Sequence, residues 1–341
     1  MVRRADDYPC STAAGRGAAK PVSRPIPLLL IAMVIAVPLS LLAGRVWIDP
    51  FDPVTPNAAV ILTELRLPRA LLALCVGAGL GAAGAAMQGY LRNPLADPGL
   101  FGIAPGAALG AVLSFWTGYS AAPWTLPLFS LAGAAAAMAL LGLIAGRSGG
   151  VALFTLAGMM IASLAGALMS LAISLSPTPF AMSEIVTWLM GALTDRGWHE
   201  VWIAAPLTLA GLVLLRLAGR GLDALTLGEA AARSLGVSPR RLTALIVAGV
   251  GLTVGAGVAV AGIIGFVGLV VPHLVRPLTD RRPSRLIVPS ALAGALLVLV
   301  ADVLCRILPL AGGELRLGIA LSLLGAPFFL ALLLRIRRGL A

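Results

Sequence analysis

The nine residues Arg92-Asn93-Pro94-Leu95-Ala96-Asp97-Pro98-Gly99-Leu100 interrupt a chain that is otherwise almost continuously apolar. Proline lacks an amide donor and restricts the residue before it, so the two prolines prevent the preceding apolar helix, residues 71–88, from continuing. Asn, Asp and Gly, which complete the stretch, are typical of tight turns. The stretch therefore predicts a rigid turn between two helices.

The composition places these helices in a membrane. Hydrophobic residues make up 59% of the 341 positions and charged residues only 11%, and the mean hydropathy is +1.00. A water-soluble protein of this length needs more charged residues to cover its surface. The chain is therefore predicted to be an all-α protein that crosses the bilayer many times.

About ten membrane spans can be distinguished, because a helix needs about 20 apolar residues to cross a hydrocarbon core of about 30 Å. The eighth segment is short. It is either completed by the preceding Gly262-Ile263-Ile264-Gly265 or is a broken helix that other helices shield from lipid. The predicted spans are residues 27–46, 70–88, 101–116, 125–145, 151–175, 201–217, 242–261, 266–275, 286–305 and 317–334.

The basic residues predict the orientation of the chain. An even number of spans places both termini on one side, and with cytoplasmic termini most of the 25 Lys and Arg residues lie inside. This positive-inside distribution predicts a multi-pass membrane protein with cytoplasmic termini and accounts for the net charge of +11. The arginines are dispersed over separate loops, which argues against a nucleic-acid partner. Residues 1–26 are predicted to be a disordered cytoplasmic tail, 27–336 the transmembrane domain, and 337–341 a second cytoplasmic tail.

The chain lacks the motifs of an enzyme. Its only lysine, Lys20, lies in the predicted tail and outside any GxxxxGK[ST] pattern, so the chain has no Walker A loop. His199 and His273 are predicted to lie on opposite membrane faces, which disfavours a metal or haem site. We therefore expect no catalytic activity and no cofactor in this chain, and we expect any ATP hydrolysis to take place in a partner subunit.

One carboxylate, Asp302, lies inside a predicted span. Intramembrane acids are typical of ion-coupled transporters, so a secondary transporter is an alternative class for this chain. Arg306 follows four residues later on the same helix face, in the order that favours an ion pair. Asp302 is thus either a coupling group or one half of a pair that neutralises itself near the membrane surface.

A weak internal similarity relates residues 68–76 (PRALLALCV) to residues 239–247 (PRRLTALIV). The two segments open the second and seventh predicted spans. An offset of five spans gives them opposite orientations in the membrane, as in the inverted repeats of many transporters. The sequence therefore favours a 5+5 inverted repeat.

Several sequence blocks in a fixed order resemble the FecCD-type permeases of ATP-binding cassette importers for iron-siderophores, haem and cobalamin. They cover nearly everything except the N-terminal tail. The blocks are ELRLPR (64–69), GAAMQG (84–89), RNPLADPG (92–99), WLMG (188–191) with Trp198, GFVGLVVPH (265–273), Ala301-Asp302 with Arg306, and GAPFF (325–329).

This resemblance implies a ten-helix permease of the bacterial inner membrane that pairs with a second permease copy, identical or different, around a central translocation path. It also implies two cytoplasmic ATPase subunits and an extracytoplasmic solute-binding protein as partners. Transport would proceed by alternating access, driven by ATP hydrolysis in the partners. An iron-siderophore is the commonest cargo in the family and is therefore the predicted cargo, with cobalamin and haem as the alternatives.

A cytoplasmic connection at residues 219–240 contains a short amphipathic segment that ends at a glycine, as helices commonly do. An ordinary surface helix is one interpretation. The resemblance instead implies the coupling loop that contacts the ATPase, with coupling roles for Leu225, Gly228, Glu229, Ala230, Arg233 and Gly236. It also implies that the short turn formed by Ser148, Gly149 and Gly150 is part of the cytoplasmic gate, where glycines would permit a hinge.

Three arginines on the predicted outer face, Arg66, Arg69 and Arg306, match positions at which the family's cobalamin permease presents arginines to acidic residues of its binding protein. The planar guanidinium group suits this role because it stays charged and can hold a carboxylate with two hydrogen bonds. The resemblance therefore implies a docking site for the binding protein. Anchoring in the lipid headgroups is the alternative for Arg66 and Arg69.

Overall fold

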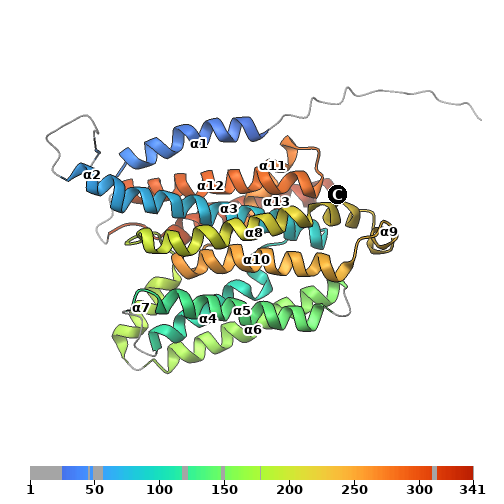
Figure 1. The fold of residues 1–341 in the computed structure, drawn as a ribbon, viewed down its shortest axis with the longest axis horizontal. Helices are drawn as coiled ribbons and strands as arrows, with labels where there is room; N and C mark the ends of the chain where they lie inside the picture. The colour runs from blue at the N-terminus through green and yellow to red at the C-terminus, as the bar shows by residue number, and fades with distance from the viewer. Residues whose placement is uncertain are drawn as a thin grey trace, which may run out of the picture.

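The computed structural model describes residues 25–44, 47–48, 57–116, 122–146, 150–176, 178–308 and 313–340, and every regular element within them is a helix. The helices form one elongated bundle (Figure 1). In this described part, eight helices are long and apolar enough to cross a membrane, and two shorter apolar helices, Ile103–Trp116 and Val267–Leu278, accompany them. A helix thus lies at each of the predicted spans, so the prediction of an all-α membrane fold is confirmed.

The elements follow one another in chain order as α1 (Pro25–Leu42), α2 (Ala58–Val60), the π-helix η1 (Ile61–Arg66), α3 (Leu67–Leu91), the 3-10 helix η2 (Pro98–Phe101), α4 (Ile103–Trp116), α5 (Thr125–Ala145), α6 (Val151–Ser174), α7 (Pro179–Leu189), α8 (Trp198–Leu225), α9 (Glu229–Ser234), α10 (Pro239–Ala261), α11 (Val267–Val275), the 3-10 helix η4 (Arg276–Leu278), α12 (Pro283–Ile307) and α13 (Leu317–Leu340). Helix α1 begins within the segment predicted as the disordered tail, whose residues 1–24 lie outside the described residues. Helix α13 continues into the predicted C-terminal tail, because no glycine or proline lies between Leu334 and Gly339.

The predicted turn after α3 is confirmed. α3 ends at Leu91, and Arg92 adopts the left-handed conformation with φ 51°. Two short turns follow: the Asn93 Oδ1 atom accepts a hydrogen bond from the Leu95 amide (2.9 Å), and the Asp97 Oδ1 atom accepts one from the Gly99 amide (2.7 Å). Each side-chain oxygen thus accepts a hydrogen bond from a backbone amide of the turn, which fixes the path of the chain towards α4.

Helix α3 lies at the centre of the bundle, where it packs against α8, α10, α11 and α12. Most of its side chains are buried. Its glycines permit the close approach: Gly77 faces the backbone of Gly294 in α12, and Gly84 faces the backbone of Gly268 in α11. Small residues stabilise helix pairs in lipid by letting the backbones come together. The glycine-rich sequence of α3 therefore determines which helices surround it.

Gly84→Ala is expected to lower the free energy of unfolding by about 2 kcal/mol, because the new Cβ would overlap the carbonyl oxygen of Gly268. Gly166→Ala in α6 is the matched control, since no described atom lies within 4 Å of a Cβ at that position. The control should be neutral or slightly stabilising. Thermal unfolding of both purified variants in detergent measures the difference. Equal stabilities would contradict the close approach of α3 and α11.

The short eighth span is a broken helix, as one of the two alternatives predicted. α10 ends at Ala261, and α11 begins only after Phe266, which has φ 66°. Inside α11, Pro272 lacks the amide that would otherwise bond to the carbonyl of Gly268. The side chain of Gln88 in α3 points its Nε2 at that carbonyl from 3.4 Å. The broken helix is thus buried in protein, where other helices replace its missing backbone partners.

Helices α3 and α10, which carry the two similar sequence segments, contact each other and run in opposite directions along the bundle (Figure 1). α10 begins with a proline in its first turn, where a missing amide costs nothing, whereas Pro68 of α3 directly follows η1 within one continuous helical stretch from Ala58 to Leu91. Opposite directions are what an inverted repeat requires. The arrangement supports the predicted 5+5 repeat.

Candidate functional site

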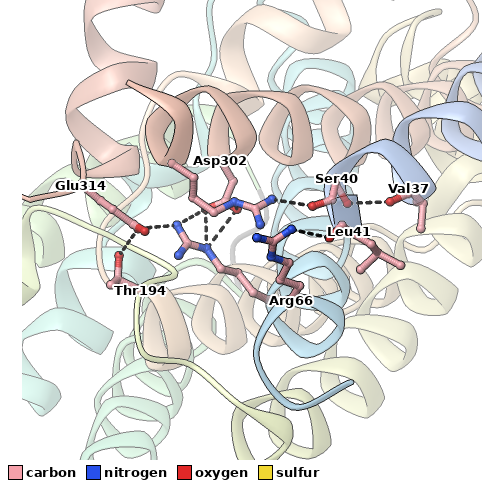
Figure 2. Close-up of polar contacts among 9 residues, drawn as sticks. Val37, Ser40, Leu41, Arg66, Thr194, Asp302 and Glu314 are labelled. Atoms are coloured by element: carbon pink, nitrogen blue, oxygen red, sulfur yellow. Dashed lines mark hydrogen bonds and ion pairs between the residues drawn. The ribbon is translucent and has the colours of Figure 1, made fainter. Parts of the chain in front are cut away.

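Five ionisable side chains meet at the end of the bundle where α1 and α12 end (Figure 2). We call this group the charge network. It draws on η1 and α3, on α12, and on the segment that precedes α13. Its members are Arg66, Arg69, Asp302, Arg306 and Glu314.

Arg69 is the centre of the charge network. Its Nε atom donates to both carboxylate oxygens of Asp302 (3.0 and 3.1 Å), and its Nη2 atom donates to Asp302 Oδ1 (2.9 Å) and to Glu314 Oε2 (2.8 Å). The same Glu314 oxygen accepts a hydrogen bond from the Thr194 hydroxyl at 3.1 Å. The side chain of Asp302 is only 1% exposed. Since a buried carboxylate requires charged or hydrogen-bonding partners, Arg69 stabilises Asp302 inside the bundle.

The other two arginines fasten α1 to the bundle. Arg306 lies with its Nε atom 3.2 Å from Asp302 Oδ2, and its Nη2 atom donates to the carbonyl of Ser40 at 3.2 Å. Arg66 donates to the carbonyls of Leu41 and Leu42, at 2.8 and 2.7 Å. The last carbonyls of a helix have no partner within the helix, and arginine is well suited to bind them. Both arginines therefore cap the C-terminal end of α1.

The structure brings together all three arginines that were predicted to dock a binding protein. It directs them at carboxylates and carbonyls of the chain itself. The charge network contains three guanidinium groups and two carboxylates, so it keeps one positive charge in excess, although the hydrogen bonds of Arg66 go to backbone carbonyls. Docking stays a prediction. The predicted ion pair of Asp302 with Arg306 is confirmed, whereas the contribution of Glu314 and Thr194 was missed, because no local pattern connects residues so far apart in sequence.

Arg69 also controls the titration of Glu314. Burial raises the pKa of Glu314, but the hydrogen bond and the positive charge of Arg69 outweigh burial and hold that pKa below its ordinary value. A carboxylate whose pKa is lower in the folded state stabilises the fold at pH values above its ordinary pKa of about 4.3. This stabilisation is lost as the pH falls through the lower value of the folded protein.

Glu314→Gln is therefore expected to destabilise the protein at pH 7 by about 0.5–1 kcal/mol, because the pair is partly exposed and screened by solvent. The difference from the unsubstituted protein should shrink as the pH falls below about 4 and vanish once Glu314 is protonated in both states. Thermal unfolding between pH 7 and about pH 3 tests this. A difference that does not change with pH would show that the charge of Glu314 has no part in the stabilisation.

The opposite end of the bundle carries α9, the predicted coupling segment (Figure 1). The predicted short helix that ends at a glycine is confirmed, although the connection is shorter than residues 219–240, because α8 continues to Leu225. Gly228 (φ 101°) and Gly236 (φ 82°) lie on either side of α9 in conformations that favour glycine. Leu225 is buried in the last turn of α8, whereas Ala230 and Arg233 are exposed on α9. The two exposed residues are thus accessible to a partner.

Glu229 brings α9 next to the predicted gate. Its Oε1 atom lies 3.5 Å from the Val151 amide in the first turn of α6. Gly150 precedes this turn and offers no side chain that could cap the helix. A carboxylate near a helix N-terminus is favourable, because the first amides of the helix lack partners and carry partial positive charge. Of the predicted gate, Gly150 thus lies beside α9, while Ser148 and Gly149 lie outside the described residues.

A buried aromatic cluster holds the first turn of α6 from its other side. The ring of Phe154 in α6 lies 5.0 Å from the ring of Tyr90 in α3 and 5.6 Å from that of Phe101 in η2. The Tyr90 hydroxyl lies 2.7 Å from the Thr243 hydroxyl in α10. The start of α6 is therefore held between α9 and the turn that follows α3. The predicted coupling segment and the start of α6 beside the predicted gate are thus in direct contact.

Comparisons with known proteins identify close relatives. A model of the FecCD transport family matches residues 29–335. The vitamin B12 import system permease protein BtuC of Escherichia coli O9:H4 (strain HS) is 40% identical over 313 residues, which cover 91% of this chain and 94% of that protein. The protein of the same description from Shigella sonnei (strain Ss046) matches equally. A solved structure of a metal-chelate type ABC transporter in an inward-facing conformation has a TM-score of 0.83 and 32% identity, over 91% of this chain and 98% of that chain.

Proposed function

The chain belongs to the FecCD transport family, and from this premise we propose that it is the permease subunit of an importer for a cobalamin-type metal chelate. The family consists of the membrane permeases of ATP-binding cassette importers. The partners we propose are a second permease copy, two ATPase subunits and an extracytoplasmic solute-binding protein. Both termini and α9 would lie in the cytoplasm, where the ATPase subunits are.

The observation that supports cobalamin is the 40% identity to the vitamin B12 permease, which extends over 94% of that protein. The prediction of an iron-siderophore depended only on the frequency of that cargo within the family, and the relatives found here are described as vitamin B12 permeases. An iron chelate is the second candidate, because the structural relative is described as a transporter of the metal-chelate type.

The charge network argues against the alternative of an ion-coupled transporter. Such a transporter uses an intramembrane acid that relays a proton or an ion during transport. Asp302, the candidate for this role, is held by Arg69 and also faces Arg306. Its negative charge is thus already compensated by fixed positive charges. The energy for transport must then come from a partner, which is consistent with the missing Walker A loop.

The excess positive charge of the network supports docking of an acidic binding protein at this end. Arg69 holds Asp302 and Glu314 in the present conformation. A carboxylate of the binding protein would add to the charge network or replace Glu314, which is 23% exposed and the more accessible of the two acids. Guanidinium groups permit such an exchange, because they can hold more than one carboxylate.

Uptake of labelled cargo by a strain that lacks only this chain tests the proposal. We expect uptake of cobalamin to be lost and uptake of haem and of ferric siderophores to be retained. Loss of siderophore uptake with normal cobalamin uptake would assign the second candidate instead. In a separate assay, the purified chain alone in vesicles should not accumulate any of these compounds under a proton or sodium gradient. Accumulation there would contradict an importer driven by ATP.

A further inference from the structure

A groove with a volume of about 820 Å³ lies between α8 and α10 at the α9 end of the bundle. Three arginines line it: Arg216 and Arg220, one helical turn apart on α8, and Arg241 in the first turn of α10. All three are exposed. The rest of the lining is mainly apolar and includes Leu217 and Leu245. The groove thus combines a cationic rim with a hydrocarbon floor.

The positive charge of the groove is not neutralised within the described part of the chain. No carboxylate lines the groove, and no ion pair joins the three arginines to an acid there. The acids of the same end have other partners. Asp223 accepts hydrogen bonds from the backbone amide and the hydroxyl of Ser284, Asp280 pairs with Arg282 and Arg285, and Glu229 faces α6. Arg216 also lines a neighbouring pocket with Asp280, but the ion pairs of Asp280 are with Arg282 and Arg285. Within the groove itself no carboxylate competes with an anionic occupant.

An exposed apolar stripe on α8 leads to the groove. Its side chains, four or seven residues apart and hence on one helix face, are between 52% and 73% exposed. Arg216 and Arg220 follow on the same face of α8. The stripe consists of Trp202, Leu209, Val213 and Leu217. Apolar side chains so exposed on a membrane-spanning helix require hydrocarbon contact, and here that surface ends at fixed cations.

We propose that the groove binds an anionic phospholipid. The phosphate diester lies among Arg216, Arg220 and Arg241, and an acyl chain extends along the apolar stripe of α8. Guanidinium groups bind phosphate oxygens with paired hydrogen bonds. Basic pockets between membrane helices on the cytoplasmic side are suited to anionic headgroups. The inference requires only that α8 and α10 span a membrane. It is independent of the cargo and of the coupling role of α9.

Native mass spectrometry of the purified chain in detergent tests the proposal, with dioleoyl phosphatidylglycerol and dioleoyl phosphatidylcholine as the probes. Each arginine near an anionic lipid contributes about a fivefold preference, so three should favour phosphatidylglycerol on the order of a hundredfold. The triple variant Arg216→Gln, Arg220→Gln, Arg241→Gln should lose this preference. The control triple variant Arg92→Gln, Arg233→Gln, Arg337→Gln removes the same charge from exposed positions outside the groove and should keep it.

Two further measurements test the arginine fork and distinguish a bound lipid from a bound free phosphate. If the first variant fails to fold, the corresponding triple lysine variant keeps the charge and should bind phosphatidylglycerol more weakly, because lysine cannot hold the phosphate with a planar fork. Excess inorganic phosphate should not displace the lipid, since it cannot use the apolar stripe. Any one of four results would overturn the proposal. The two lipids could be retained equally, or the glutamine variant could keep the preference. Inorganic phosphate could displace the lipid, or the ATPase partner could displace it in the assembled complex.

Discussion

Arg69→Met is expected to lower the free energy of unfolding by about 3 kcal/mol, because it removes the main partner of a buried carboxylate. Asp302 is 1% exposed and loses all three hydrogen bonds from Arg69. Arg306 remains 3.2 Å away, but it also binds the carbonyl of Ser40 and cannot surround the carboxylate alone. Chemical or thermal unfolding of the purified variant in detergent measures the loss.

A double-mutant cycle shows whether this loss belongs to the pair. Arg69→Met combined with Asp302→Leu should cost about 1–3 kcal/mol less than the sum of the two single substitutions, because removing both charges leaves neither partner of this pair unmatched. Arg69→Lys should lie between the unsubstituted protein and Arg69→Met, since lysine keeps the charge without the fork. Arg316→Met, which lies close in sequence to Glu314 but outside the charge network, is the matched control and should be nearly neutral. Additive single and double effects would contradict a direct pairing of Arg69 with Asp302.

The spans and the turn after α3 could be predicted from the sequence because they depend on local physics. A helix of about 20 apolar residues matches the thickness of the hydrocarbon core, and the prolines between residues 92 and 100 end α3 wherever the rest of the chain lies. The eighth span stayed open between two alternatives, because local physics shows that the apolar segment is short but not what surrounds it. The broken helix depends on the Gln88 side chain of α3, which lies 180 positions along the chain from the Gly268 carbonyl that it faces.

The contacts of the charge network that the sequence did not predict join residues far apart along the chain. The Asp302–Arg306 pair is visible because both residues lie on one helix, four positions apart. Arg69 and Glu314 are separated from their partners by most of the chain, and no periodic pattern relates them. Helix α7 was also missed, because its 11 residues are too short to span a membrane and its Glu184 breaks the apolar run.

The predicted coupling segment and the predicted gate were inferred separately, and only the structure shows that they touch. Glu229 matched a family motif, and Gly150 matched a hinge position. Neither observation contained the contact between Glu229 and the Val151 amide that joins α9 to α6. The coupling hypothesis can therefore be tested by removing the Glu229 carboxylate, which makes this contact.

Glu229→Ala is expected to reduce uptake by the assembled transporter about tenfold while ATP hydrolysis stays within about twofold of normal. The substitution leaves the exposed residues Ala230 and Arg233 for contact with the ATPase. It removes the carboxylate that faces the first turn of α6. A hydrogen bond to a charged group contributes about 1.5–3 kcal/mol, and we use the lower value because the distance is 3.5 Å. That energy corresponds to about a tenfold shift in a coupled equilibrium.

Parallel measurements of uptake and ATP hydrolysis in vesicles separate this effect from a loss of assembly. Glu229→Gln keeps an oxygen that can accept the Val151 amide and should retain most uptake. Arg233→Ala removes the other contact of Glu229, the 3.5 Å ion pair on α9, together with a predicted ATPase contact, so uptake and hydrolysis should fall together in this variant. Equal loss of uptake and hydrolysis in Glu229→Ala would instead assign Glu229 to ATPase binding. Normal uptake in that variant would show that α9 moves the gate by another route, through the aromatic cluster around Phe154.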